Sequence, residues 1–441
     1  MLRANNKDSK YIGFNEKISI IIPTLNRSEY LIRALHYYNK VGFTGYICVG
    51  DSSEQEHAKQ LSEFIDKKVV NHNLKIIYKY YPKSLYTLID VVNELFALVP
   101  TPYVVSSGDD DFLVSPSLAK CVEFLEMHSD YIAVHGIRMS YRLDSKKPFG
   151  NIVETHYTCQ HEWESDKASL RWPGYMRYAN ATLYFVHRRS AYKRMLQDTS
   201  KVKSHYLGAE LLPCSFTPIL GKVKKIDCLS TLFEIKGGDE KEFSWDTHSM
   251  YKFLLAPDWY QSVLIVKQNI VKGLMAADSI TQIEASEIFD REFCNHIIVF
   301  LSWQYKKKFG ESISSKAFET IGRNINEYIS IYELITSPDW HSKVIKAREE
   351  GVMGLLSQKM AKNESDAKSQ YDKYLWKYLL VLMSIQYQIK YQNQRIDIEA
   401  SIKSNSDDFK SKLSVKSLLD PSSPYHNDFM PVYEILLGRY E

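Results

Sequence analysis

Four short apolar runs in the first 110 residues alternate with longer segments of helical spacing, and this alternation constrains the fold more than any other feature. The runs cover residues 17–24, 46–53, 74–78 and 103–106. Between them, apolar residues recur every three or four positions, as on the buried face of an amphipathic helix. Strands that alternate with helices of this length form right-handed βαβ units around a parallel sheet. The sequence therefore predicts an α/β fold for this part of the chain.

Polar residues directly follow three of these runs, at the point where each predicted strand ends. They are Thr24-Leu25-Asn26-Arg27, Asp51-Ser52-Ser53 and Asp109-Asp110-Asp111. The carboxyl ends of parallel strands meet at one edge of a sheet. We therefore expect the three groups to converge on one crevice.

The three consecutive carboxylates at 109–111 repel one another, so a folded chain keeps them together for a reason. A divalent cation is the commonest reason, because it cancels the repulsion and takes hard oxygen ligands. A site rich in Asp and poor in His and Cys favours Mg²⁺ or Mn²⁺ over zinc. The alternative is a solvated turn whose Asp residues cap a helix that begins near Ser117.

Several classes of function are disfavoured by what the sequence lacks. No Gly-x-Gly-x-x-Gly follows the first run and no Gly-Lys-Ser/Thr loop is present, which argues against a dinucleotide cofactor and a P-loop. The chain has 56 Lys and Arg against 53 Asp and Glu, so no nucleic-acid partner is expected. The same balance, and the βαβ context of the acidic cluster, argue against a polymerase in which Gly-Asp-Asp lies on a hairpin.

The expected location is the cytoplasm. The six cysteines are scattered without a Cys-x-x-Cys pair, the first ten residues have no apolar core of a signal peptide, and no apolar run is long enough to span a bilayer. Two segments that mix lysine with aromatic residues, 305–309 and 376–378, leave open a peripheral contact with the inner face of a membrane. Solvated helix ends are the favoured alternative for both segments.

The pattern changes at about residue 249, where glycine becomes rare and long segments of helical spacing dominate. They cover 259–277, 283–305, 325–335 and 370–392. We therefore expect two domains, an α/β domain over 1–248 and a mainly α-helical accessory domain over 249–441. The helical domain carries no chemical motif of its own, and it is a candidate surface for a homodimer.

Three motifs, Ile18 to Arg27, Val49 to Ser53 and Gly108 to Phe112, resemble the N-terminal half of a GT-A fold glycosyltransferase, most closely a family 2-like enzyme. The resemblance covers roughly residues 15–240 and implies a Rossmann-like GT-A domain with a mostly parallel sheet. It also implies an inverting transfer of a sugar from a nucleotide-diphosphate donor to a hydroxyl of a glycan, lipid-linked or protein acceptor. A catalytically silent module that binds nucleotide sugar or glycan as a scaffold is the alternative.

The resemblance also assigns roles to individual residues. It implies that a bound Mn²⁺ or Mg²⁺ lies between Asp109 and Asp111. It implies that the nucleotide sugar is held by Pro23, Thr24, Asn26, Arg27, Asp51, Ser52, Asp109 and Asp110.

The general base implied by the resemblance is Glu210, in Gly208-Ala209-Glu210-Leu211. Leu211 stands where related enzymes have a second acid, and the alternative role of Glu210 is a first-turn carboxylate stabilised by a helix dipole. Lys236 stands where His is often found, and its ammonium group is a candidate partner of the departing diphosphate. A solvated lysine is the favoured alternative there.

The acceptor is expected between the acidic cluster and Glu210, where aromatic and polar residues are concentrated. Aromatic rings stack on the C–H faces of sugars, and neighbouring amides bind hydroxyl groups. Trp172, Tyr175 and Asn180 are the predicted acceptor-binding residues. The alternative is that these aromatic side chains belong to the core.

Overall fold

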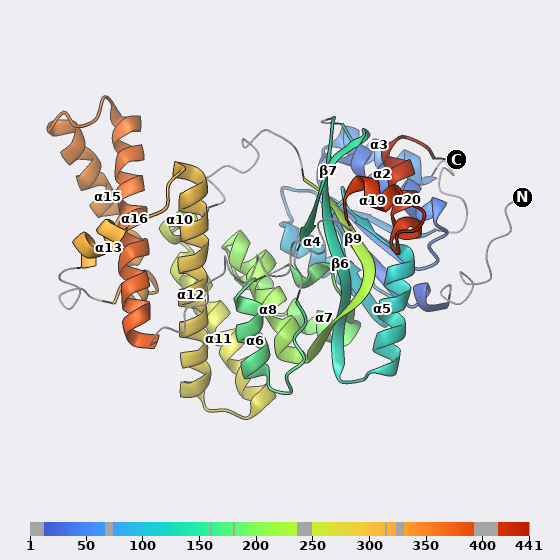
Figure 1. Ribbon diagram of the computed structural model, residues 1–441, viewed down its shortest axis with the longest axis horizontal. Coiled ribbons are helices and arrows are strands. Elements are labelled where there is room, and N and C mark those ends of the chain that lie inside the picture. The colour runs from blue at the N-terminus through green and yellow to red at the C-terminus, as the bar shows by residue number, and fades with distance from the viewer. Residues whose placement is uncertain are drawn as a thin grey trace, which may run out of the picture.

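The structure is a computed structural model, and it describes nine stretches of the 441-residue chain. These are residues 13–66, 74–145, 147–158, 161–179, 181–235, 249–313, 315–322, 330–391 and 413–440. Figure 1 shows a twisted sheet with helices around it at one end of the molecule, and a row of helices that extends away from it.

The described part of the chain forms a nine-stranded sheet in the order β3-β2-β1-β4-β8-β6-β9-β5, with β7 paired to β6. β1 pairs in parallel with β2 and β4, β2 with β3, and β6 with β9. β8 is antiparallel to β4 and β6, β7 to β6, and β5 to β9. The strands are β1 (Ile18–Thr24), β2 (Tyr46–Asp51), β3 (Lys75–Tyr80), β4 (Tyr103–Ser106), β5 (Phe112–Leu113), β6 (Tyr131–Leu143), β7 (Ile152–Thr158), β8 (Val186–Arg188) and β9 (Lys222–Glu234). The predicted α/β fold with a mostly parallel sheet is confirmed.

Helices cover both faces of the parallel half of this sheet. They are α2 (Ser28–Lys40), α3 (Gln55–Asp66), α4 (Leu88–Ala97) and α5 (Ser115–Met127). Alternate residues of β1 enter two different cores: Ile21 packs with Val91 and Leu95 of α4, whereas Ile20 and Ile22 pack in the other core with α2 and α5. A strand buried on both faces reads as a continuous apolar run, which explains the sequence of β1.

Helices of the middle of the chain connect the sheet to the C-terminal helices. The first set is α6 (Ala168–Met176), α7 (Arg189–Met195) and α8 (Leu212–Leu220). The second set is α10 (Met250–Leu255), α11 (Trp259–Asp278), α12 (Gln282–Phe309), α13 (Ser315–Gly322), α14 (Ile331–Ile335), α15 (Trp340–Ser357) and α16 (Glu364–Tyr391). α11 packs on α6 and α8, and α12 packs on α6 and α16. The predicted helical character of the C-terminal region is confirmed, and no helix among the described residues is long and apolar enough to cross a membrane.

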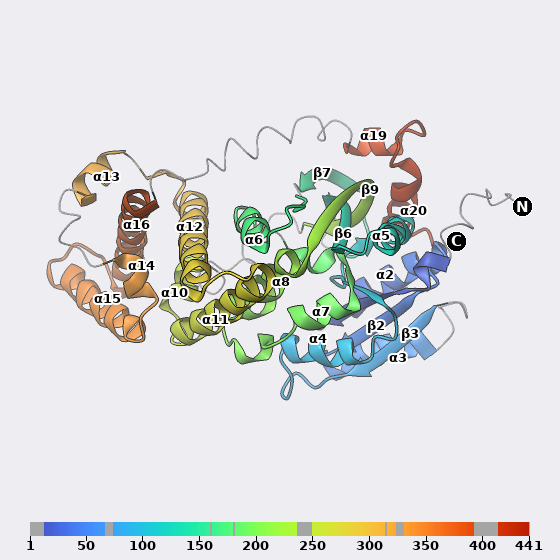
Figure 2. The same cartoon turned by 90° about the horizontal axis from the view of Figure 1, so that it is seen from below.

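The last two helices, α19 (Val415–Leu419) and α20 (His426–Leu436), return to the sheet. α20 packs on α2, and α19 packs on β7. The Tyr425 hydroxyl donates to Asp227 at 2.6 Å, and the Gly150 amide donates to the Leu436 carbonyl at 2.9 Å. Figure 2 shows α19 near β7 and α20 near α2, at the end of the molecule that holds the sheet. The end of the chain therefore belongs to the α/β core, which the sequence did not indicate, and the expected boundary at 248/249 borders on residues outside the described part.

We predict that Phe429→Ala destabilises the whole fold. Phe429 is fully buried between α20 and the sheet domain, and truncation of a buried Phe costs about 3–5 kcal/mol. Leu170→Ala is the matched control, because Leu170 is 61% exposed and surface changes cost within about 0.5 kcal/mol. Urea denaturation measures both, and equal midpoints for the two variants would contradict the packing of α20.

Candidate functional site

The polar groups that follow β1 and β4 meet through their side chains. The Thr24 hydroxyl donates to Asp109 Oδ2 at 2.7 Å. The Arg27 guanidinium forms an ion pair with Asp109 at 3.1 Å and a second one with Asp110. The loop after β1 and the acidic cluster are therefore one hydrogen-bonded unit, as the convergence of strand ends predicts.

The loop after β2 joins the same unit. Asn26 adopts a left-handed backbone with φ of 55°, and its amide donates to the Ser53 hydroxyl at 2.7 Å. The Ser52 amide donates to the Thr24 carbonyl at 3.0 Å. Asp51 is fully buried and accepts from the Ser53 amide at 2.8 Å and from the Tyr78 hydroxyl at 2.9 Å. The structure thus brings together Thr24, Asn26, Arg27, Asp51 and Ser52.

The acidic cluster is not a solvated turn. Asp109 and Asp111 are each 5% exposed, and Asp111 accepts a hydrogen bond from the Tyr184 hydroxyl at 2.8 Å. Burial, followed by the charge of Asp110, raises the pKa of Asp111 to about 7. At Gly108 a Cβ would lie 2.8 Å from Asp111 Oδ2, so glycine allows the Asp111 carboxylate to fold back against the loop.

Arg33 is hydrogen-bonded to the backbone of the acidic cluster, and the sequence did not indicate this role. Its side chain is fully buried and forms an ion pair with Glu234 at 2.9 Å. It also donates to the Asp110 carbonyl at 2.6 Å and to the Pro148 carbonyl. Its position on the apolar face of α2, between Tyr30 and Tyr37, was the available signal. An arginine there needs buried acceptors, and the sequence does not say where they lie.

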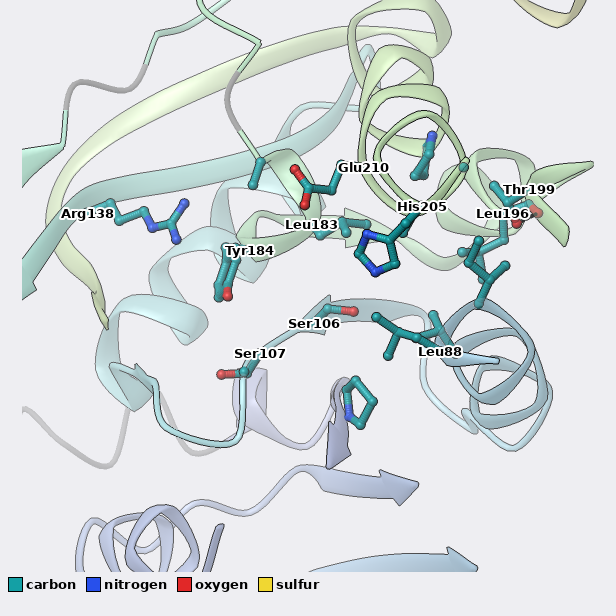
Figure 3. Close-up of a pocket in the computed structure, with 18 residues that line it drawn as sticks. Leu88, Ser106, Ser107, Arg138, Leu183, Tyr184, Leu196, Thr199, His205 and Glu210 are labelled. Atoms are coloured by element: carbon teal, nitrogen blue, oxygen red, sulfur yellow. Dashed lines mark hydrogen bonds between the residues drawn. The ribbon is translucent and has the colours of Figure 1, made fainter. Parts of the chain in front are cut away.

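A cavity of about 370 Å³ opens beside the acidic loop. Ser106, Ser107 and Gly108 form one side of it, and α4 contributes Leu88. Figure 3 shows Glu210, His205, Arg138 and Tyr184 around this space. Pro23 also lines it. The cavity therefore connects the edge of β4 with the predicted base.

Glu210 lies in a π-helical turn, Tyr206–Leu211, that leads into α8. Such turns are rare and occur frequently at functional sites. Burial raises the pKa of Glu210, although its side chain is accessible from the cavity. A helix dipole acts most strongly on the first turn of a helix. Glu210 is the fifth residue of the π-helical turn and therefore lies beyond that region. Desolvation therefore dominates the environment of this carboxylate.

The π-helical turn is anchored to the C-terminal helices. The Tyr206 hydroxyl is hydrogen-bonded to Nε2 of His296 on α12, and burial lowers the pKa of His296 to about 4, so its imidazole is neutral. The Tyr206 ring stacks on Phe253 of α10 with centroids 5.6 Å apart. At Gly208 a Cβ would lie 2.8 Å from the Val202 carbonyl, so glycine permits the close packing of this turn.

Arg138 of β6 is a further cation that the sequence did not indicate. Its guanidinium lies between the rings of Tyr184 and Phe233, 4.2 Å from each centroid. It lines the cavity, and its charge opposes the rise in the pKa of Asp111. An arginine held between two rings presents a fixed positive charge to whatever occupies the cavity.

The predicted acceptor residues require a correction. Trp172 and Tyr175 are 0% and 1% exposed. Trp172 stacks on Phe289 of α12, and Tyr175 packs edge-on against Trp163. Both rings belong to the core, so neither is available to an acceptor. Asn180 and Lys236 lie outside the described residues.

The donor set fits a hard divalent cation. Asp109 and Asp111 offer carboxylate oxygens, which are ligands that such a cation prefers, and burial followed by the charge of Asp110 raises the pKa of Asp111. Among the described residues, no group of three or more His, Cys, Asp or Glu is arranged to hold a metal ion. The described residues would therefore supply Asp109 and Asp111, and Mg²⁺ or Mn²⁺ bound this way would take further ligands from phosphates and water.

Comparison with known proteins finds one matching family model and solved structures to which the chain is similar. Residues 19–186 match the family model of glycosyl transferase family 2. No curated protein matches the chain. The chain is similar to residues 1–349 of TarS from S. aureus in complex with UDP-GlcNAc, with 14% identity, a TM-score of 0.45, and coverage of 86% of this chain and 94% of that one. It is also similar to the mannosyltransferase PcManGT from Pyrobaculum calidifontis in complex with GDP-Man and Mn²⁺, with 10% identity, a TM-score of 0.37, and coverage of 85% and 88%.

We predict that Arg33→Met costs about 3–5 kcal/mol of unfolding free energy, because it leaves the buried Glu234 carboxylate without its partner. The double variant Arg33→Met/Glu234→Leu should recover part of that loss. Full recovery is not expected, since Arg33 also binds the Asp110 carbonyl. Urea denaturation measures the cycle. Lys59→Met, which breaks an exposed pair with Glu63, is the control, and an equally small effect of Arg33→Met would rule out its supporting role.

Proposed function

We propose that this chain, a family 2-like glycosyltransferase of GT-A fold whose family 2 domain spans residues 19–186, moves a sugar from a nucleotide-diphosphate donor to an acceptor hydroxyl with inversion. One observation carries the proposal. A single cavity runs from Gly108, next to the acidic cluster, to Glu210, a carboxylate whose pKa is raised by burial. An acidic cluster beside a cavity and a separate base on that cavity are what an inverting transfer from a diphosphate donor requires.

The proposed nucleotide subsite is the hydrogen-bonded unit at the ends of β1 and β2. Asp51, Thr24, Asn26 and Ser52 would hold the loops that surround the nucleoside, since Asp51 is itself fully buried in contact with Ser53 and Tyr78. The side chain of Arg27 is 30% exposed, so it can reach a ligand while it stays near Asp109 and Asp110. Arg138 faces the cavity as a second cation for the phosphates.

Asp109 and Asp111 would hold the divalent cation. When bound, the cation stabilises negative charge on the departing diphosphate as a Lewis acid. Asp111 must be ionised to ligate it, and burial together with Asp110 opposes that ionisation. Arg138 and the Tyr184 hydroxyl favour the ionised form. These two contacts therefore keep Asp111 close to the ionised state. The described residues alone do not provide a complete set of ligands for the cation.

Glu210 would remove the proton of the acceptor hydroxyl. The acceptor oxygen forms its bond to the anomeric carbon as the bond from that carbon to the diphosphate oxygen breaks, and the proton passes to the Glu210 carboxylate. The raised pKa makes this carboxylate a stronger base than an ordinary glutamate, because partial burial favours its protonated form. Leu88 and Leu183 line the same cavity as apolar side chains.

A panel of nucleoside diphosphates and sugar nucleotides, with and without Mn²⁺, tests the proposal. Binding to the native state raises the thermal midpoint by mass action. Release of the nucleoside diphosphate from the donor that binds then reports turnover. Donor binding without any turnover would favour a silent scaffold.

We predict that Glu210→Gln leaves the donor-induced thermal shift unchanged and lowers the transfer rate about 10²–10⁴-fold, since the amide cannot accept the proton. In the parent enzyme the base must be ionised, so the rate falls as pH drops through the raised pKa of Glu210. The acid limb of kcat/KM should lie above 4.5, the ordinary pKa of this group. Glu349→Gln, an exposed acid on α15, is the control. Unchanged turnover in Glu210→Gln would place the base elsewhere.

We predict that Asp111→Asn removes the Mn²⁺-dependent part of the donor-induced thermal shift. The variant is expected to fold, because the substitution keeps the shape of Asp111 and removes a buried charge. The metal-independent part of the shift should remain, since it comes from the nucleotide subsite. A Mn²⁺-dependent shift of parental size in Asp111→Asn would exclude Asp111 as a ligand.

A further inference from the structure

A second cavity lies beside the first one, on the other side of Leu196. It is a broad cleft of about 1140 Å³, and Leu196 lines both spaces. α4 also runs along both, with Leu88 and Val92 on the first and Asn93 and Phe96 on the second. The two spaces are therefore neighbours along α4, with Leu196 between them.

The cleft is strongly basic. Arg188, Arg189, Lys193 and Arg194 line it, and among the described residues that line it none is acidic. Arg188 is committed to the fold, because it donates to the carbonyls of Leu125, His128 and Tyr131. The other three cations stand on α7 and form no ion pair with a described carboxylate. Elsewhere on the surface, cations such as Lys222 and Lys224 are each paired with two acids.

Two of the three cations are held in place by aromatic rings. The Arg189 guanidinium lies 5.5 Å from the centroid of Phe96, and that of Arg194 lies 4.6 Å from the centroid of Phe216. Arg194 also donates to the amide oxygen of Gln197. Stacked guanidinium groups lose little freedom when they bind an oxyanion, and they bind phosphate and carboxylate in a two-pronged manner. Lys193 adds an exposed, mobile point charge.

We propose that this cleft binds the negatively charged groups of the acceptor. The inference rests on the proposed function and deepens it: the acceptor is a chain that carries phosphate or carboxylate groups. Its reacting hydroxyl lies near Glu210, and its anionic portion passes Leu196 to Arg189, Lys193 and Arg194. These three cations would then favour anionic acceptors over neutral ones, although they do not contact the bonds that form and break near Glu210.

The test uses the full chain and the double variant Arg189→Gln/Lys193→Gln, with Lys59→Gln/Lys346→Gln as the matched control. The control removes the same charge from side chains that are 75% and 77% exposed. Calorimetry measures binding of linear polyphosphate, of polygalacturonate oligomers and of neutral dextran. We expect the parent and the control to bind one or both anions and not dextran. The cleft variant should bind the same anion at least about tenfold more weakly, with an unchanged donor-induced thermal shift.

The two anions distinguish phosphate from carboxylate as the preferred group. Equal anion binding by the cleft variant and the parent would overturn the inference, because the anion would then bind elsewhere. An equal loss of binding in the control variant would also overturn it, because the total charge of the protein would then decide binding. Absence of donor turnover in the parent, with anion binding still lost in the cleft variant, would overturn the proposed function and leave the anion site standing.

Discussion

Three adjacent carboxylates at the end of β4, of which Asp109 and Asp111 are buried, are the constraint on which the site depends. Like charges at this spacing repel strongly when water is excluded. Asp109 is held by Thr24 and Arg27, and Asp111 by Tyr184. Arg33 fixes the backbone of Asp110 from a fully buried position. The cluster is thus tied to the ends of β1, α2 and β9, and these contacts determine where the carboxylates point.

The C-terminal helices contribute to the same site through packing. The apolar core that includes Ile21 of β1 continues through α8 and α11 to α12 and α16. Trp172 of α6 stacks on Phe289 of α12, and Tyr206 is hydrogen-bonded to His296. The π-helical turn that carries Glu210 is therefore held between the sheet and the helices. A change in the packing of α12 would move Glu210 relative to the acidic cluster, because Tyr206 couples the two.

The sequence predicted what depends on local pattern. Strand ends, helix spacing and the polar groups after β1, β2 and β4 are encoded by neighbouring residues, and these predictions agree with the fold. Long-range partners were not predictable in the same way. The pairing of Arg33 with Glu234 joins residues 201 positions apart, and nothing near Arg33 specifies it. Trp172 and Tyr175 were assigned to the acceptor because aromatic residues serve both sugars and cores, and only burial decides between the two. The return of α20 to α2 was also invisible, since an amphipathic helix does not specify which surface it covers.

The two cavities differ in charge in a way that follows from their position along α4. The first cavity, which Leu88 lines, has among its described lining residues one acidic side chain, Glu210, and one arginine, Arg138. At the end near Phe96, the cations of α7 give a site for anions. An anionic acceptor that enters both is repelled by the carboxylates and attracted by Arg189 and Lys193, so its charged groups lie toward α7 and its hydroxyl groups toward Glu210. Charge along one helix would in this way orient the acceptor before any contact at the reacting oxygen is made.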